Sequence, residues 1–265
     1  MANHYTTNKD EWRALADIDY FGMFVKAYIP FNAWMNVTYP TFPMDRAKIN
    51  AVKRDTNPFR DKIYSFLDAD TQEGANFRNA IGELHYLLEN HYIHNQDRRI
   101  TFTDIVLGKN PDNIKEDSYR GIGFRVQYGN GSGSTETHSL VKRKNGRAIF
   151  TKVQADYNLS ELKACPDYTA LKEEYKKRLV KCYELVTPDL TQNLLAGFDV
   201  NDPSRYYEIG QFKFIKDRES IAKGLIEILY NMRNSLFHGE LIPNKAVNKI
   251  YGAAYKILRE LIEAL

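Results

Sequence analysis

Three side chains near the C-terminus could act together on a phosphodiester bond. Arg233, Asn234 and His238 lie within six residues of one another. A guanidinium can hold a phosphate through two hydrogen bonds and offset the charge that develops in a transition state. A neutral imidazole, with a reference pKa of about 6.5, can take a proton from a 2′-hydroxyl or give one to the leaving oxygen. Such a pair could cleave RNA without a metal ion and leave a 2′,3′-cyclic phosphate.

The residues before this motif predict the helix that carries it. Most apolar positions recur at spacings of three or four: Ile221, Leu225, Ile228, Leu229, Met232 and Leu236. This pattern is one face of a helix with about 3.6 residues per turn. Asp217 is the expected N-cap and Gly239 the expected C-cap, and Pro243 follows soon afterwards. The motif therefore lies in the last turn of a buried helix.

Helix geometry decides which of the three side chains can meet. Asn234 and His238 are four residues apart and share a face, so Asn234 could fix the imidazole tautomer or hold the helix end against a partner. Arg233 and His238 are about 140° apart around the axis, at about 100° per residue, and do not converge on one regular helix. A second copy related by a two-fold axis could complete the site, and we therefore expect a homodimer.

The segment Arg233-Asn-Ser-Leu-Phe-His238 resembles the R-x4-6-H signature of the HEPN superfamily (higher eukaryotes and prokaryotes nucleotide-binding domain). The early stretches Asp17-Ile-Asp-Tyr20 and Phe31-Asn-Ala-Trp34 are similar in style to the first helix of many HEPN proteins. The resemblance implies an all-α domain, a dimer that pairs two motifs, and metal-independent endoribonuclease activity. Many members act in phage defence or as toxins.

The resemblance also implies roles for the motif residues. Arg233 and His238 from two protomers would form one composite cleft, supported by Asn234. RNA would be the substrate, and an antitoxin or another defence-system protein a further partner. Some members lack activity, so two alternatives stay open: a scaffold in a defence assembly, and a nucleotide- or RNA-binding module.

The rest of the chain predicts a mainly α bundle with an inserted small antiparallel β-sheet, α+β overall, and the resemblance implies that the bundle is HEPN-like. The helical domain is expected over residues 1–95 and 161–265, and the β-rich insert over residues 96–160. Apolar periodicity predicts helices over residues 9–39 with a kink or split at Pro30, and over 45–54, 59–67, 70–93, 168–185 and 247–262. Asp70-Thr-Gln-Glu73 is expected to be a capping box. Strands are expected over residues 100–107, 121–128, 137–141 and 148–153, with turns at 129–133 and a type I′ turn at Asn145-Gly146.

Basic residues concentrate at one predicted hairpin and its surroundings. A projecting basic hairpin could track a phosphate backbone. A solvated charged turn explains the same residues equally simply, and that alternative stays open. The candidate RNA-binding residues are Arg98, Arg99, Arg120, Arg125, Lys142, Arg143, Lys144 and Arg147.

The net charge, the apolar runs and the cysteine count of the chain exclude several classes of protein. A net charge of +3 is compatible with nucleic acid but too small to indicate it. No apolar run approaches about 18 residues, so we expect no membrane span. Two cysteines and the absence of signal-peptide features predict a reduced, cytoplasmic protein. Three histidines on one predicted helix do not make three or four converging ligands, so we expect surface histidines, no metal and no cofactor: His85, His91 and His94.

Overall fold

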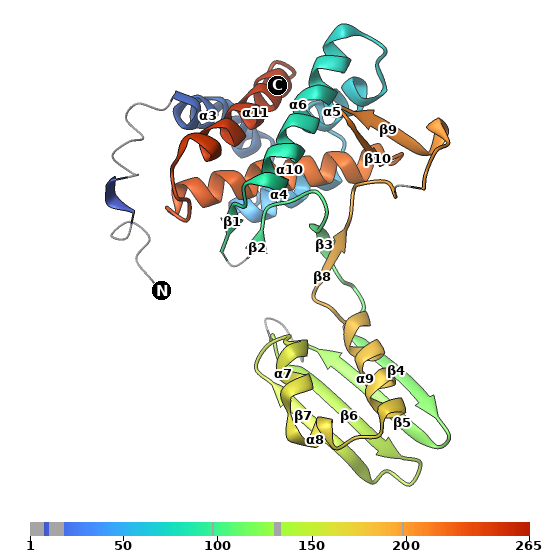
Figure 1. Cartoon of the computed structure of the whole chain (residues 1–265). Helices are drawn as coiled ribbons and strands as arrows, with labels where there is room; N and C mark the ends of the chain where they lie inside the picture. The colour runs from blue at the N-terminus through green and yellow to red at the C-terminus, as the bar shows by residue number, and fades with distance from the viewer. Residues whose placement is uncertain (1–7, 11–18, 97, 130–133, 198) are drawn as a thin grey trace. The chain divides into compact units, whose positions relative to one another are not determined.

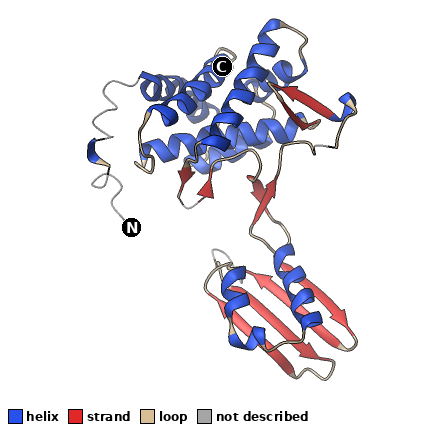
Figure 2. Ribbon diagram, viewed as in Figure 1, coloured by secondary structure: helices blue, strands red, loops and turns tan. Residues whose placement is uncertain are grey.

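The computed structural model describes residues 8–10, 19–96, 98–129, 134–197 and 199–265. The chain divides into two compact units. Unit 1 comprises Met1–Leu107 and Thr191–Leu265, and unit 2 comprises Gly108–Leu190. The class is α+β, with most long helices in unit 1 and the largest sheet in unit 2 (Figure 2). Unit 2 differs from the expected insert of residues 96–160, because it begins later and includes residues 161–190.

Unit 1 is a helical bundle built around one central helix. Its helices are α3 (Asp19–Thr38), α4 (Asp45–Arg54), α5 (Pro58–Asp68), α6 (Gln72–Asn90), α10 (Arg218–Phe237) and α11 (Lys245–Ile262). Helix α11 packs against α3 and α6, and α10 packs against α4 and α5 (Figure 1).

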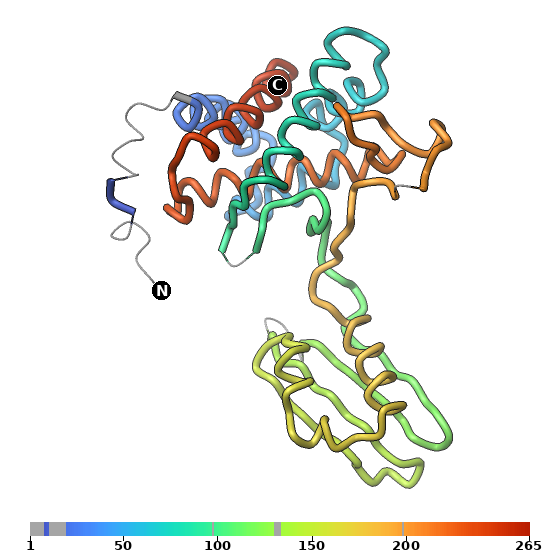
Figure 3. The backbone as a smooth tube through the Cα atoms, viewed as in Figure 1, coloured from blue at the N-terminus to red at the C-terminus, as the bar shows by residue number. Residues whose placement is uncertain are grey.

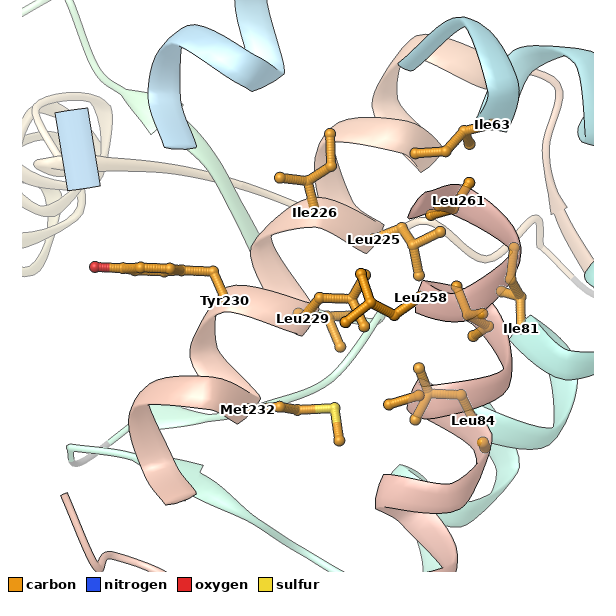
Figure 4. Packing of buried hydrophobic residues seen from close by; sticks show 14 of the residues in the cluster. Ile63, Ile81, Leu84, Leu225, Ile226, Leu229, Tyr230, Met232, Leu258 and Leu261 are labelled. Atoms are coloured by element: carbon orange, nitrogen blue, oxygen red, sulfur yellow. The ribbon is translucent and has the colours of Figure 1, made fainter. Parts of the chain in front are cut away.

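Helix α10 is buried on every side along most of its length. Figure 4 shows its Leu225 and Leu229 beside Leu258 of α11, within the core cluster of unit 1. A helix that is buried on most of its faces belongs in the middle of a bundle, because each buried face needs a partner. The motif is therefore attached to a helix that is buried in the core of the unit.

Short strands complete unit 1. Strand β1 (His94–Asn95) pairs with β2 (Arg98–Arg99), and β9 (Tyr206–Ile209) pairs with β10 (Phe212–Ile215). The chain leaves unit 1 along β3 (Ile105–Lys109) and returns along β8 (Asp189–Gln192), and these two strands pair (Figure 3).

Unit 2 is a four-stranded antiparallel sheet with helices on one face. The strands β4 (Ile114–Tyr119), β5 (Ile122–Tyr128), β6 (Thr137–Arg143) and β7 (Ala148–Gln154) follow one another in sheet order. Phe124 and Val141 on the covered face pack with Leu179 of α9 (Glu173–Leu185) in a separate core. Two short helices precede α9, namely α7 (Leu159–Ala164) and α8 (Pro166–Thr169).

Several helix predictions are confirmed and others are wrong. Helix α4 has the predicted bounds. Helix α3 continues through Pro30, so of the predicted kink or split the split does not occur. The N-cap of α6 is Thr71 rather than Asp70, so the predicted capping box does not form. A Cβ at Gly74 would lie 2.8 Å from the carbonyl oxygen of Ala69, so the turn between α5 and α6 leaves no room for a side chain at this position. Residues 11–18, which include Asp17 and Ile18 of the predicted first helix, lie outside the described residues.

Three of the four predicted strands correspond to β5, β6 and β7 of unit 2, and the end of the fourth, predicted over residues 100–107, corresponds to β3. Residues 100–104 are not a strand, and β4 was not predicted. The predicted helix over residues 168–185 is interrupted between α8 and α9. Residues 130–133 of the predicted glycine-rich turn lie outside the described residues.

The predicted type I′ turn is also at a different place. Gly146 has φ 83°, and its N–H donates to the carbonyl of Arg143 at 2.9 Å, but Asn145 does not have positive φ. That turn is therefore a type I turn closed by a glycine bulge. The two-residue I′ turn is Arg120-Gly121, where φ is 48° and 76°.

Candidate functional site

The end of α10 presents the motif. The carboxylate of Asp217 caps the start of this helix by accepting from the N–H groups of Glu219 and Ser220. At the other end the C-cap is His238 and not Gly239 as predicted, and Gly239 follows it with φ 66°. The N–H of Glu240 donates to the carbonyl of Ser235 at 3.0 Å, which is the closing bond of a Schellman motif. Both ends of the helix are therefore fixed, and so is the backbone of His238.

The imidazole of His238 is exposed. Within the described part of the chain it makes no hydrogen bond or ion pair through its ring. It is therefore accessible to a ligand, which a histidine sealed in packing would not be.

Arg233 is held by three neighbours. Its Nη1 donates to Oδ1 of Asn234 at 3.0 Å, and its Nη2 lies 3.6 Å from Oδ2 of Asp45. Its guanidinium carbon lies 4.7 Å from the ring centroid of Phe237. Only 24% of the side chain is exposed, so the guanidinium is half-buried and oriented.

These contacts correct one of the two roles expected for Asn234. Its side-chain oxygen accepts from Arg233 rather than from the ring of His238, so it positions the guanidinium and not the imidazole tautomer. No hydrogen bond joins Arg233 to His238 in the described residues, in keeping with their separation around the helix axis.

Tyr28 on α3 lies in the same electrostatic environment. Burial raises the pKa of this phenol well above its ordinary value, and the positive charge of Arg233 partly opposes that shift. The phenol therefore stays protonated at neutral pH and remains a neutral neighbour of the guanidinium.

A polar stripe leads from the core to this exposed end. Glu227, Asn231, Asn234 and His238 are spaced by four, three and four residues, which places them along one face of α10. Asn231 Oδ1 accepts from Nδ2 of Asn95 at 3.0 Å, which joins the stripe to β1. The stripe therefore begins at a buried carboxylate and ends at a solvent-exposed imidazole.

The buried carboxylate of Glu227 is paired with two cations from α4. Arg46 Nη1 donates to both of its oxygens, at 2.6 and 2.8 Å, and Lys53 Nζ donates to Oε2 at 2.7 Å. The side chains of Glu227 and Lys53 are only 3% and 6% exposed. This cluster fixes α4 against α10 beside the motif.

The sequence contained a signal for this cluster that our predictions did not use. Glu227 stands between Ile226 and Ile228 in a helix that is otherwise apolar there, and a buried carboxylate needs cationic partners. Arg46 and Lys53 are seven residues apart on a predicted helix, and so share a face.

The β1–β2 hairpin closes over the last turn of α10. Ser235 Oγ donates to the carbonyl of His94 at 2.5 Å, and the N–H of Gln96 donates to the carboxylate of Glu240 at 2.7 Å. Arg99, a predicted RNA-binding residue, is engaged in the same region. It pairs with Glu89 at 2.8 Å, and its guanidinium carbon lies 3.9 Å from the ring centroid of Tyr92.

The eight candidate RNA-binding residues fall into two groups. Arg98, Arg99 and Arg125 each have an acidic partner, namely Asp104, Glu89 and Glu116. The other five are exposed and make no ion pair with any described residue: Arg120, Lys142, Arg143, Lys144 and Arg147. The exposed group belongs entirely to unit 2, whereas Arg98 and Arg99 belong to unit 1.

The three histidines singled out from the sequence, His85, His91 and His94, are not part of a metal site among the described residues. His85 is buried, contrary to the prediction of a surface histidine, because its ring fits edge-on against Phe102, Phe212 and Phe214. Burial lowers its pKa, which favours the neutral ring. In the part of the chain that the structure describes, no group of three or more His, Cys, Asp or Glu side chains could hold a metal ion. None of the described helices combines the length and apolar character needed to cross a bilayer.

Comparison of the chain with models of known protein families gives no match. Searches of curated proteins and of solved structures give none either.

Proposed function

We propose that this protein is a HEPN-type, metal-independent endoribonuclease. The 2′-oxygen of the substrate attacks the adjacent phosphorus, the bond to the 5′-oxygen breaks, and the products carry a 2′,3′-cyclic phosphate and a 5′-hydroxyl. His238 takes the proton from the 2′-hydroxyl or gives one to the departing 5′-oxygen. Arg233 holds the phosphate and offsets its developing charge. Asn234 fixes the guanidinium.

One observation carries the proposal. An exposed imidazole stands on a capped helix end, one turn beyond a guanidinium that Asn234 and Asp45 hold in one orientation. Orientation of this kind reduces the entropy lost when a phosphate binds. Because Arg233 and His238 do not pair within one chain, the site is completed in a homodimer, where the imidazole of one protomer serves the guanidinium of the other. The protein would work in the cytoplasm, in phage defence or as a toxin with a neutralising partner.

A second candidate is a non-catalytic scaffold. The pairing of Arg233 with Asp45 favours it, because a guanidinium that already has a carboxylate partner holds α4 to α10 without any substrate. In a scaffold the same residues stabilise the dimer or a larger assembly and need no access to RNA.

The test compares purified wild-type protein with Arg233→Ala and His238→Ala variants on total RNA in the presence of EDTA. Cleavage by the wild type but not by Arg233→Ala or His238→Ala, with 2′,3′-cyclic phosphate ends, supports the enzyme. His91→Ala serves as the matched histidine control, since His91 is exposed like His238 and lies at the end of α6, outside the motif. Equal degradation by all variants would mean another source of activity.

Expression in bacteria gives an independent readout. A nuclease should be toxic, and His238→Ala should relieve the toxicity while circular dichroism stays unchanged. Wild-type protein that is harmless, and that loses a protein partner rather than RNA cleavage when the α10 end is altered, would favour the scaffold.

A further inference from the structure

Unit 2 contains a hollow at the turn end of its sheet. Its volume is about 670 Å³, and its walls come from the β4–β5 turn, the β6–β7 turn and the start of α9. The N–H of Lys144 donates to the carbonyl of Gly121 at 2.8 Å, so the two turns are tied together. The hollow is therefore a fixed feature of the fold of unit 2 and does not depend on unit 1.

The walls of this hollow carry positive charge without compensation. Arg143, Lys144 and Lys172 line it, and no carboxylate does. All three are exposed, and within the described residues none of them takes part in an ion pair. Three unneutralised cations around one concave site attract an anion that carries several charges, such as successive phosphates of a nucleic-acid strand.

A second hollow on the same unit shows the contrast. It lies over Gly123 and is lined by Arg125 and Lys142, but also by Glu116 and Asp117. Arg125 is paired with Glu116 at 3.2 Å. Its charges therefore balance one another, and it offers little attraction to an anion.

The basic hollow also has an aromatic wall. Tyr175 lines it, half-buried, and its ring rests edge-on against Phe124 with the centroids 5.7 Å apart. Lys172 Nζ lies 5.9 Å from the centroid of the same ring. A held aromatic ring beside cations is the combination that binds single-stranded nucleic acid, because bases stack on the ring while cations hold the backbone. A base in a duplex must first be unpaired and unstacked before it can enter such a hollow, which costs a few kcal/mol.

We propose that this hollow binds a short single-stranded stretch of RNA. The phosphates contact Arg143, Lys144 and Lys172, and one base lies against Tyr175. The choice of RNA over DNA rests on the proposed nuclease function, whereas the phosphate and base chemistry rests on unit 2 alone. The site would hold the substrate strand independently of the residues that cleave it.

The experiment uses full-length protein carrying His238→Ala, with EDTA, so that RNA is bound but not cut. A fluorescently labelled single-stranded RNA of twelve nucleotides is the probe, and anisotropy gives the affinity. The variant that removes the cations of the hollow, called the groove variant, combines Arg143→Ala, Lys144→Ala and Lys172→Ala. The matched control removes the same number of positive charges from exposed positions of unit 2 outside the hollow, by alanine at Lys163, Lys177 and Lys181.

The groove variant should weaken binding at least tenfold more than the control. It should also reduce the slope of log affinity against log salt by about 2, as expected for the loss of three phosphate contacts at about 0.7 per contact. Tyr175→Leu should weaken binding on the order of tenfold and Tyr175→Phe very little, because the ring and not the hydroxyl does the stacking. A labelled duplex of the same sequence should bind more weakly than the single strand.

Equal losses in the groove and control variants would overturn the proposal, and so would undetectable binding at low salt. Two results together would overturn the base contact. Inorganic polyphosphate of equal charge would compete as well as unlabelled RNA, and Tyr175→Leu would bind the RNA as tightly as the protein with Tyr175. The proposed nuclease activity is tested separately. If the wild type does not cleave RNA but the groove variant still loses RNA binding, the nuclease proposal fails and the binding site in unit 2 stands.

Discussion

Removing the buried carboxylate of Glu227 should destabilise unit 1 strongly. Glu227→Ala leaves Lys53, whose side chain is 6% exposed, without its counter-charge in the core. Breaking a buried ion pair from one side costs about 3–5 kcal/mol, because the remaining charge stays desolvated. Arg46 adds less to this cost, since its side chain is 44% exposed and can turn to water. For a unit of this size the loss corresponds to a fall in Tm of roughly 6–20 °C, at about 2–4 °C per kcal/mol.

Urea unfolding followed by tryptophan fluorescence measures this free energy. Both tryptophans of the chain belong to unit 1, so the signal reports the unit that contains Glu227. Glu83→Ala is the matched control, because Glu83 makes an exposed pair with Lys256 at 2.9 Å, with side chains 46% and 53% exposed. Pairs of that kind contribute at most about 1 kcal/mol.

A double variant separates the loss of charge balance from the loss of packing. Glu227→Leu combined with Lys53→Met removes both buried charges and keeps apolar volume, and should recover most of the stability. If Glu227→Ala and Glu83→Ala lower the free energy of unfolding equally, the reasoning about the buried cluster is wrong.

Three further predictions concern other parts of unit 1. Gly82→Ala should cost about 1–3 kcal/mol in urea unfolding, because the new Cβ would lie 2.7 Å from the Ile209 carbonyl oxygen and 2.9 Å from Gly210 Cα; an unchanged midpoint would contradict this. Burial lowers the pKa of His85, so its contribution to stability is complete above the unfolded pKa of about 6.5 and is lost as pH falls towards the folded pKa. His85→Phe should therefore flatten the dependence of Tm on pH below about 6.5. Burial raises the pKa of Asp217, but its N-cap hydrogen bonds lower that pKa by more, so the net pKa is below its ordinary value. Asp217→Ala should cost about 1 kcal/mol of unfolding free energy at pH 7. The difference in stability between wild type and variant should shrink as pH falls through the lowered pKa.

Local signals were sufficient to predict the motif helix. Asp217 and Gly239 lie within a few residues of the backbone groups that they cap, so short-range sequence determines both ends of α10. The apolar positions between them repeat with the helical period. Prediction succeeded here because every interaction needed to define the helix is close in sequence.

Strand β4 could not be predicted in the same way. Its sequence, Ile114-Lys-Glu-Asp-Ser-Tyr119, has no alternation of apolar and polar residues. It is held instead by its pairing with β5 and by Arg178 of α9, whose Nη1 lies 2.9 Å from Asp117 Oδ2. The β9–β10 hairpin was missed as well, since its strands are only four residues long.

The environment of the candidate site depends on contacts that are far apart in the chain. Glu227 meets Arg46 and Lys53 across separations of 181 and 174 residues. The sequence identified Arg233 and His238 as the residues of interest, but the Asp45 contact and the half-buried state of Arg233 come from the packing of α4 on α10. Tertiary contacts of this kind leave no periodic trace in a single sequence.

The order of the two units along the chain has a consequence for synthesis. Unit 2 is one continuous stretch, whereas unit 1 combines segments from either side of it. Translation adds about 5–20 residues per second, so helices α3 to α6 spend several seconds on the ribosome before α10 and α11 emerge to cover their apolar faces. Unit 2 already has all of its strands and helices by then. The nascent first half of the bundle is consequently the form of this protein most exposed to aggregation, and the one that a chaperone would protect.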